Sequence, residues 1–376
     1  MKIVLTGGGS GGHFYPIISV AQSLNEIATQ ERIATLDLLY ISTEPYDEGL
    51  LFDNNISFVS NPAGKRRRYR SILNIIDIFK MGWGVFRALW TLFKIYPDVV
   101  FGKGGYASFP TLFAARFLRI PVVIHESDTV PGRVNKWAGK FATRIAVAFP
   151  ETADYFDKEK VAYTGNPVRK ELRHPAPEGA FEFLNLEKNI PVVFVLGGSQ
   201  GSEIINDVLI DALPELLEKY QVIHQTGTNN TEQVKEMTHA RLLNHKFKNR
   251  YKMFPYLNTL AMRMAAGAAD VVISRAGAST ISEVASWGVP SILIPITDSN
   301  GDHQRQNAFA YAHAGACEVV EEKNLTQNII TSEVERLIHN SEAREKMKES
   351  AKNFSQPDAS EKIAREIIDI ALSHEQ

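Results

Sequence analysis

Hydroxyl and carboxylate side chains gather in residues 270–307, directly after a short apolar run. The run 271–273 predicts a buried parallel strand, and Gly277 predicts the turn that follows it. Ser279 and Thr280 offer hydroxyls where a helix should begin. A helix that begins at the carboxyl end of a parallel strand presents unpaired amides and the positive end of its dipole. The stretch therefore predicts an anion-binding site.

Glu283 follows in the same predicted helix, and the spacing puts it with Ser282 in the first turn. A carboxylate there would repel a phosphate, but it would stabilise its own helix as a capping group. One turn further in, it would instead accept two hydroxyl hydrogens, as from a ribose. The spacing leaves both interpretations open. Residues 288–290 end this helix, and 291–296 read as the next strand.

Three glycine-rich loops each follow a short apolar strand, at residues 7–12, 102–108 and 197–202. Glycine lets the backbone approach a ligand without a Cβ in the way. Two such loops in one Rossmann-like domain suggest a site for a long anionic ligand. The first loop formally matches the dinucleotide fingerprint, but the acidic residue expected about 20 positions later is missing. His13, at the mouth of that loop, is the candidate for chemistry.

The motifs R-A-G-A-S-T-I-S-E and D-H-Q-x-x-N (302–307) resemble the donor motif of glycosyltransferases of the two-Rossmann, GT-B type. The version here is similar to the MurG family of bacterial UDP-N-acetylglucosamine transferases. G-G-G-S-G-G-H, G-K-G-G-Y and T-G-N-P-V-R (164–169) match that family in order, so the resemblance covers nearly the whole chain. It departs at H-E-S-D (125–128), because Asp128 stands where the family often has asparagine. An extra carboxylate there would repel phosphate unless it is neutralised.

The resemblance implies an α/β fold with two Rossmann-like domains facing a cleft, the GT-B fold. The first predicted domain is 1–164 with the C-terminal helix 357–376, and it should bind the acceptor and the membrane. The second is 165–356, and it should bind the UDP-sugar. The chain length of 376 residues agrees, since domains commonly have about 100–200 residues.

The implied reaction moves N-acetylglucosamine from UDP to the 4-hydroxyl of undecaprenyl-pyrophosphoryl-N-acetylmuramoyl-pentapeptide, with inversion. Such a transfer requires a base near the acceptor hydroxyl and stabilisation of the leaving diphosphate. His13 and Glu126 are the predicted catalytic residues, and Asp128 is a further candidate for the base. The chain contains no D-x-D sequence, so we expect no metal and no cofactor; loop amides and Arg169 should hold the diphosphate.

Further contacts are carried over from the family by position. Glu283 should bind the ribose, and Gln304 with Asn307 the hydroxyls of the sugar. The expected substrate-binding residues are Ser10, Gly11, Gly12, Arg169, Ser199, Ala278, Ser279, Thr280, Ile281, Ser282, Glu283, Gln304 and Asn307.

A basic and aromatic segment suggests contact with a membrane surface. Residues 65–70 hold five basic residues in six, and 72–96 have apolar side chains at helical spacing. The segment is too charged and too interrupted by glycine to span a bilayer. We expect most of the apolar stripe to pack on the sheet and the rest to dock on an anionic surface. The expected patch comprises Arg66, Arg67, Arg68, Phe79, Trp83 and Phe86.

Composition narrows the class of partner. The net charge of −2 argues against a nucleic-acid binder, and the lone Cys317 excludes an internal disulfide and fits a reducing compartment. No signal peptide is visible, so we expect a peripheral protein on the cytoplasmic side of the inner membrane. The expected partners are UDP-N-acetylglucosamine, the undecaprenyl-linked acceptor, an anionic membrane surface and cell-wall synthesis proteins.

Three rival functions remain open on the sequence. A UDP-N-acetylglucosamine 2-epimerase shares the fold and the donor half, but it would not need the basic and aromatic segment. A glycosyltransferase acting on another lipid fits that segment, but fits the first glycine loop and T-G-N-P-V-R less well. A non-catalytic sugar-nucleotide-binding adaptor would tolerate the loss of His13.

Overall fold

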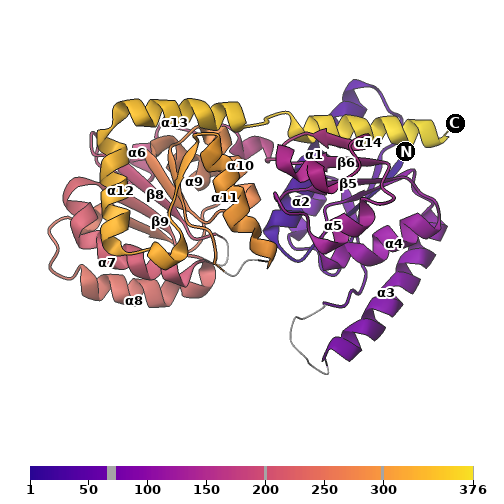
Figure 1. The fold of residues 1–376 in the computed structure, drawn as a ribbon, viewed down its shortest axis with the longest axis horizontal. Coiled ribbons are helices and arrows are strands. Elements are labelled where there is room, and N and C mark those ends of the chain that lie inside the picture. The colour runs from indigo at the N-terminus through magenta and orange to yellow at the C-terminus, as the bar shows by residue number, and fades with distance from the viewer. Residues whose placement is uncertain (66–72, 199–200, 298–299, 376) are drawn as a thin grey trace. The chain divides into compact units, whose positions relative to one another are not determined.

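The computed structural model describes residues 1–65, 73–198, 201–297 and 300–375 (Figure 1). The chain forms two compact units: the first holds Met1–Arg169 with Gln356–Gln376, and the second holds Lys170–Ser355. The division falls after Arg169 and not after residue 164, because the intervening segment packs on the first unit. The Val168 carbonyl accepts a hydrogen bond from the Ser19 hydroxyl at 2.9 Å.

The first unit is built on a parallel sheet with the strand order β3-β2-β1-β4-β5-β6-β7. Its strands are β1 (Lys2–Thr6), β2 (Asp37–Ser42), β3 (Ile56–Ser60), β4 (Val99–Gly102), β5 (Val122–Glu126), β6 (Arg144–Val147) and β7 (Val161–Tyr163). Its helices are α1 (Gly11–Gln30), α2 (Glu48–Asp53), α3 (Leu73–Ile95), α4 (Phe109–Phe117), α5 (Arg133–Ala138) and α14 (Ala359–Glu375).

Helices cover both faces of this sheet, which is why its strands are apolar on both sides. Ile3 and Leu5 of β1 pack with α1 and α14 in one core cluster. Val4, between them, packs with α3, α4 and α5 in another cluster on the opposite face. The C-terminal helix α14 lies along α1, so the end of the chain completes the core of the first unit (Figure 1).

The second unit repeats this plan with the parallel order β10-β9-β8-β11-β12-β13. Its strands are β8 (Val192–Leu196), β9 (Gln221–Gln225), β10 (Tyr251–Phe254), β11 (Val271–Ser274), β12 (Ser291–Leu293) and β13 (Cys317–Val319). Its helices are α6 (Ala180–Phe183), α7 (Glu203–Lys219), α8 (Thr231–Arg241), α9 (Thr259–Ala268), α10 (Ala278–Trp287), α11 (His303–His313), α12 (Gln327–His339) and α13 (Ser341–Phe354). The predicted α/β class with two Rossmann-like domains is confirmed.

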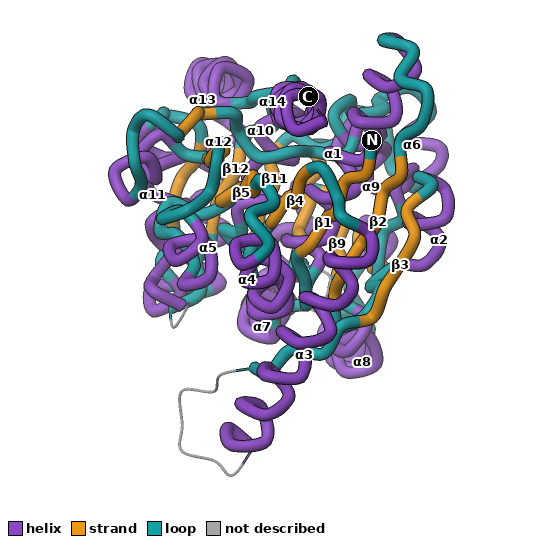
Figure 2. The backbone as a smooth tube through the Cα atoms, turned by 90° about the vertical axis from the view of Figure 1, so that its right-hand side faces the viewer, coloured by secondary structure: helices purple, strands orange, loops and turns teal. Residues whose placement is uncertain are grey.

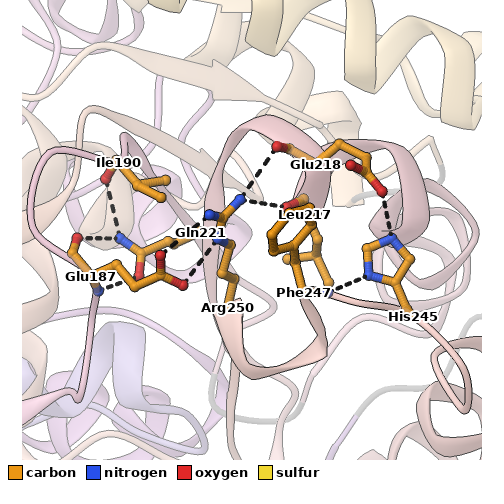
Figure 3. Close-up of polar contacts among 8 residues, drawn as sticks. All are labelled: Glu187, Ile190, Leu217, Glu218, Gln221, His245, Phe247 and Arg250. Carbon is orange, nitrogen blue, oxygen red and sulfur yellow. Dashed lines mark hydrogen bonds and ion pairs between the residues drawn. The ribbon is translucent and has the colours of Figure 1, made fainter.

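A polar cluster ties the segment before β8 to the rest of the second unit (Figure 3). The Arg250 guanidinium holds both carboxylate oxygens of Glu187, at 3.0 and 3.2 Å, and lies over the Phe247 ring. The Gln221 amide donates to the carbonyl oxygens of Glu187 and Ile190. These bonds fix the position of the segment that leads into β8.

Helix α3 differs from its prediction, because its aromatic stripe faces outward. Ala88 and Leu92 make the internal contact: both are buried, and α3 lies beside α4 (Figure 2). A Cβ on Gly84 would lie 1.8 Å from the Pro62 carbonyl oxygen, so the chain presses closely on the helix there. The exposed side chains are Ile76, Phe79 (75%), Trp83 (58%), Phe86 (58%), Trp90 and Phe93.

The expectation that most of this stripe packs on the sheet is therefore wrong. The close approach at Gly84 sets the helix rotation and leaves the bulky residues outside. None of the described helices is both long and apolar enough to cross a membrane. The predicted patch residues Arg66, Arg67 and Arg68 lie outside the described residues.

Candidate active site

The strand order of the first unit reverses between β1 and β4, and open α/β sheets bind ligands at such a switch point. The glycine loops after these two strands pack against each other. A Cβ on Gly7 would lie 3.0 Å from the Cβ of Lys103, and one on Gly9 would lie 3.2 Å from the Tyr106 ring. The loops therefore need glycine for this close contact, and they form one surface at the carboxyl edge of the sheet.

His13 lies in the first turn of α1 and is held from two sides. The Ser10 hydroxyl is 2.9 Å from His13 Nδ1. A Cβ on Gly105, in the second glycine loop, would lie 3.4 Å from His13 Nε2. Ser10, Gly11, Gly12 and His13 thus lie together at the start of α1, and the ring is fixed between the two loops.

Glu126, the other predicted catalytic residue, lies buried at the end of β5. Its carboxylate accepts hydrogen bonds from the amides of Asp128 and Gly132 and from the Asn135 side chain, at 3.1, 3.0 and 3.0 Å. Burial, and next the charge of Asp128, raises the pKa of Glu126. A carboxylate bonded by three N–H groups anchors its loop.

Arg169 is oriented by an aromatic ring of the same unit. Its guanidinium lies over the Tyr15 ring, 4.2 Å from the centroid, as in a cation–π pair. Its buried Nε atom has no hydrogen-bond partner among the described residues. A rigid fork with an unused donor suits an anion such as a diphosphate.

The second unit has its own switch point, between β8 and β11. Arg275, just after β11, joins the surrounding segments: it donates to the Ser202 hydroxyl, the Ile294 carbonyl and the Glu322 carboxylate, at 3.0, 3.2 and 2.6 Å. Burial opposes ionisation of Glu322, but bonds from Thr297 and Arg275 hold its pKa below the usual value. Sequence reasoning assigned Arg275 no role, although it opens the recognised motif.

Helix α10 starts at Ala278, with Gly277 as its N-cap, and has no acidic residue in its first turn. Glu283 is therefore in the second turn, half-buried, and the first-turn position predicted for it is wrong. This removes the basis for the capping interpretation. The Ser282 hydroxyl bonds the Ala278 carbonyl of its own helix, at 2.9 Å. Ala278 and Ile281 are buried, so they face a ligand only through their backbone.

Two predicted sugar contacts have other partners in this structure. The side-chain oxygen of Gln304 accepts a hydrogen bond from the backbone amide of Ile296 at 3.2 Å. Asn307 is fully buried and donates to the Ala276 carbonyl, so it supports the loop that precedes α10. Ser199 lies outside the described residues. Among the residues that are described, no three His, Cys, Asp or Glu side chains are grouped to hold a metal ion.

A buried polar chain in the second unit was not foreseen. The Asn206 amide donates to the Thr226 carbonyl, so its oxygen faces His224 Nε2 at 3.0 Å and accepts from it. The Tyr251 hydroxyl then donates to His224 Nδ1 at 2.8 Å. The ring is neutral, and its burial lowers the pKa of His224 from 6.5 to about 3. The chain fixes the first turns of α7, which follow the third glycine loop.

The pKa of His224 predicts a loss of stability in acid. Between pH 6.5 and about 3 the unfolded chain binds one proton more than the folded one. The contribution of His224 to the free energy of unfolding is therefore fully present above pH 6.5. It falls by about 1.4 kcal/mol for each pH unit below that value. His224→Gln should remove this part of the slope. Urea unfolding at several pH values measures this pH dependence of the free energy of unfolding. The wild type and the variant share all other histidines, so equal pH dependence in the two proteins would contradict the prediction.

Comparison with known proteins adds family evidence to this geometry. Residues 3–147 match the glycosyltransferase family 28 N-terminal domain, and residues 192–363 match its C-terminal domain. The chain is 39% identical to UDP-N-acetylglucosamine–N-acetylmuramyl-(pentapeptide) pyrophosphoryl-undecaprenol N-acetylglucosamine transferase 3 of Bacillus thuringiensis, over 91% of this chain and 93% of the relative.

Solved structures agree at the level of the fold. MurG of Acinetobacter baumannii superposes with a TM-score of 0.71 at 25% identity, covering 98% of this chain and 99% of that one. A UDP-GlcNAc 2-epimerase of Neisseria meningitidis has a TM-score of 0.66 at 17% identity, covering 99% and 100%, which shows a shared fold alone. With both domain matches and a relative of this similarity, the chain belongs to glycosyltransferase family 28.

Proposed function

We propose that this protein transfers N-acetylglucosamine from UDP-N-acetylglucosamine to the 4-hydroxyl of undecaprenyl-pyrophosphoryl-N-acetylmuramoyl-pentapeptide, in the synthesis of peptidoglycan. The observation that carries the proposal is the 39% identity, over nearly the full length of both chains, to a relative named for this transfer. The two switch points support it, because a helix begins close to each: α1 after the first glycine loop, and α10 after Gly277.

The proposed mechanism is a single displacement with inversion. The acceptor hydroxyl oxygen attacks the anomeric carbon, its proton passes to His13, and the bond to UDP breaks. If His13 Nδ1–H donates to Ser10, its Nε2 carries the lone pair that accepts this proton. The amides at the start of α10 and the Arg169 guanidinium stabilise the charge that develops on the diphosphate.

The exposed face of α3 favours a lipid-linked acceptor over the epimerase alternative. Aromatic side chains with basic neighbours at helical spacing suit a protein that lies on a bilayer, and an epimerase acting on a free nucleotide sugar needs no such surface. We place the protein at the cytoplasmic face of the membrane, where it would serve cell-wall growth and division.

The decisive assay incubates the pure protein with labelled UDP-N-acetylglucosamine and the lipid-linked muramoyl acceptor. A labelled lipid-linked disaccharide and one equivalent of UDP are expected. Omission of the acceptor should leave the donor unchanged. Conversion of the donor to its 2-epimer without acceptor would instead establish an epimerase, and UDP-sugar binding with no product of either kind would indicate an adaptor.

Glu283→Ala should weaken binding of the UDP-sugar by roughly 1.5–3 kcal/mol, the range for a hydrogen bond to a charged group. The half-buried carboxylate lies in the second turn of α10, beyond the N-terminal turn that a cap would stabilise, so the variant should keep its fold. Titration calorimetry with UDP-N-acetylglucosamine measures the change. Exposed Glu232, at the start of α8, provides the control, and its alanine variant should bind as wild type does. Unchanged affinity in Glu283→Ala would rule out the ribose contact.

A further inference from the structure

Lys103 is a buried lysine that has no role in the mechanism proposed above. It follows β4 directly, and only 2% of its surface is exposed. Its ammonium donates to the Ser127 hydroxyl, and that hydroxyl donates to the Asn166 side-chain oxygen at 3.1 Å. One chain of side chains thus joins the segments after β4, β5 and β7, the strands whose ends carry the candidate site of the first unit.

The bond to Ser127 places the ammonium beside a residue whose neighbours in the chain are Glu126 and Asp128. Burial lowers the pKa of Lys103 to about 8, while the charges of Glu126 and Asp128 oppose this and favour the ammonium. His125 adds no positive charge, because burial and next the charge of Lys103 hold its pKa well below the usual value. Lys103 therefore brings a buried positive charge close to these acids, and removing that charge should leave them less well compensated.

The same lysine begins the loop that touches His13. Gly104 and Gly105 follow it with φ of +85° and +79°, conformations that favour glycine. A Cβ on Gly104 would lie 2.8 Å from the Asn135 side-chain nitrogen, and one on Gly105 would lie 3.4 Å from His13 Nε2. A shift at residue 103 would thus move the surface on which the imidazole rests.

We propose that Lys103 is a positioning residue: its ammonium is the internal counter-ion of Asp128 and Glu126, and it holds Gly105 in place against His13. Its effect on turnover rests on the proposed function, whereas its role as counter-ion does not. Asp128 is the carboxylate that departs from the motif this chain resembles, and the ammonium bonded to the adjacent Ser127 would supply the neutralisation that such a departure requires.

The test is a charge-rescue cycle with Lys103→Met, Asp128→Asn and the double variant. Methionine keeps much of the volume and removes the charge. Lys103→Met should lower kcat by about 10–10², as misplacement by about 1 Å does, with little change in KM for UDP-N-acetylglucosamine. Its unfolding midpoint should fall by roughly 5–10 °C. The double variant should return to within about threefold of the kcat of Asp128→Asn and to a similar midpoint, because the repulsion is then relieved.

Two controls separate charge from packing. Ser127→Ala removes the hydrogen bond to the ammonium but keeps the charge, so its midpoint should fall by less than half as much. Glu126→Gln should not rescue Lys103→Met, because in either orientation of the amide its NH₂ would face a donor, that of Asp128 or those of Gly132 and Asn135. Lys103→Met behaving as wild type, independent effects of Lys103→Met and Asp128→Asn, or a Ser127→Ala loss equal to that of Lys103→Met would each overturn the proposal.

A failure of the proposed transfer reaction can be distinguished from a failure of the counter-ion role. If the wild-type protein forms no disaccharide product, the transfer reaction is wrong, and the same cycle of unfolding midpoints decides the counter-ion role without any substrate. A recovered midpoint in the double variant supports that role, and additive losses reject it.

Discussion

Replacing His13 by alanine is expected to lower turnover by about 10²–10⁴, the usual contribution of a positioned acid–base group. The imidazole is the base candidate held between two loops, with Ser10 on one side and Gly105 on the other. The fold should survive, because the ring lies at the start of α1 and outside the apolar core that the helix forms further on. Steady-state kinetics with the lipid-linked acceptor measure the loss in kcat.

Binding of the donor separates a catalytic role from a general disturbance. UDP affinity should be nearly unchanged in His13→Ala, because the predicted ribose contact belongs to α10 of the second unit. Ser10→Ala is the matched variant: the ring stays and loses one orienting bond, so its kcat should fall much less. Normal turnover by His13→Ala would remove this residue from the chemistry and direct attention to Asp128 and Glu126.

The parts of the fold that carry the site were predictable from the sequence. The strands β1, β4, β8 and β11 are apolar runs closed by glycine or a turn, and the loops after them mark the switch points. No pattern in the sequence predicts the strands β3 and β6. β6 has four residues and β3 is a half-exposed edge strand, so neither has a distinctive pattern of its own. Both form because neighbouring strands pair with them.

The contacts within the candidate site could not be predicted from residue spacing alone. Residue spacing predicted a helix near Glu283, but the actual start at Ala278 decides whether the carboxylate caps the helix or lies a turn inside it. The motif G-K-G-G-Y does not show whether Lys103 lies on the surface, and only the fold buries it and bonds its ammonium to Ser127. Arg275 and His224 act through partners far away in the chain, so no local motif identifies them.

The aromatic stripe of α3 also shows that residue spacing does not predict which way a helix face points. Spacing alone established that the residues share a face, and it could not tell whether that face packs on the sheet or lies outside. Because Gly84 and Ala88 make the inner contact, the stripe is exposed, and its role becomes a question of binding. Lys94 lies over the Trp90 ring at 4.9 Å, so a basic group borders the exposed aromatics.

Replacing Phe79, Trp83 and Phe86 together by serine should therefore release the protein from anionic vesicles. Each aromatic side chain gains about 1.5–3 kcal/mol when fully buried in an apolar medium, so even partial insertion of three should change the partition coefficient by about 10²-fold. The side chains are more than half exposed, so stability should hardly change. Co-sedimentation with vesicles measures the partition, and circular dichroism checks the fold.

A control variant tests whether vesicle binding depends on the α3 face or on exposed apolar surface in general. Phe52 on α2 is 82% exposed and Phe183 on α6 is 52% exposed, so serine at both sites removes exposed aromatic surface from helices other than α3. That control should bind vesicles as wild type does. The α3 variant should lose turnover on the natural lipid acceptor but keep it on a short-chain, soluble one, because its base and donor contacts are intact. Equal sedimentation of the α3 variant and wild type would show that the stripe does not bind the bilayer.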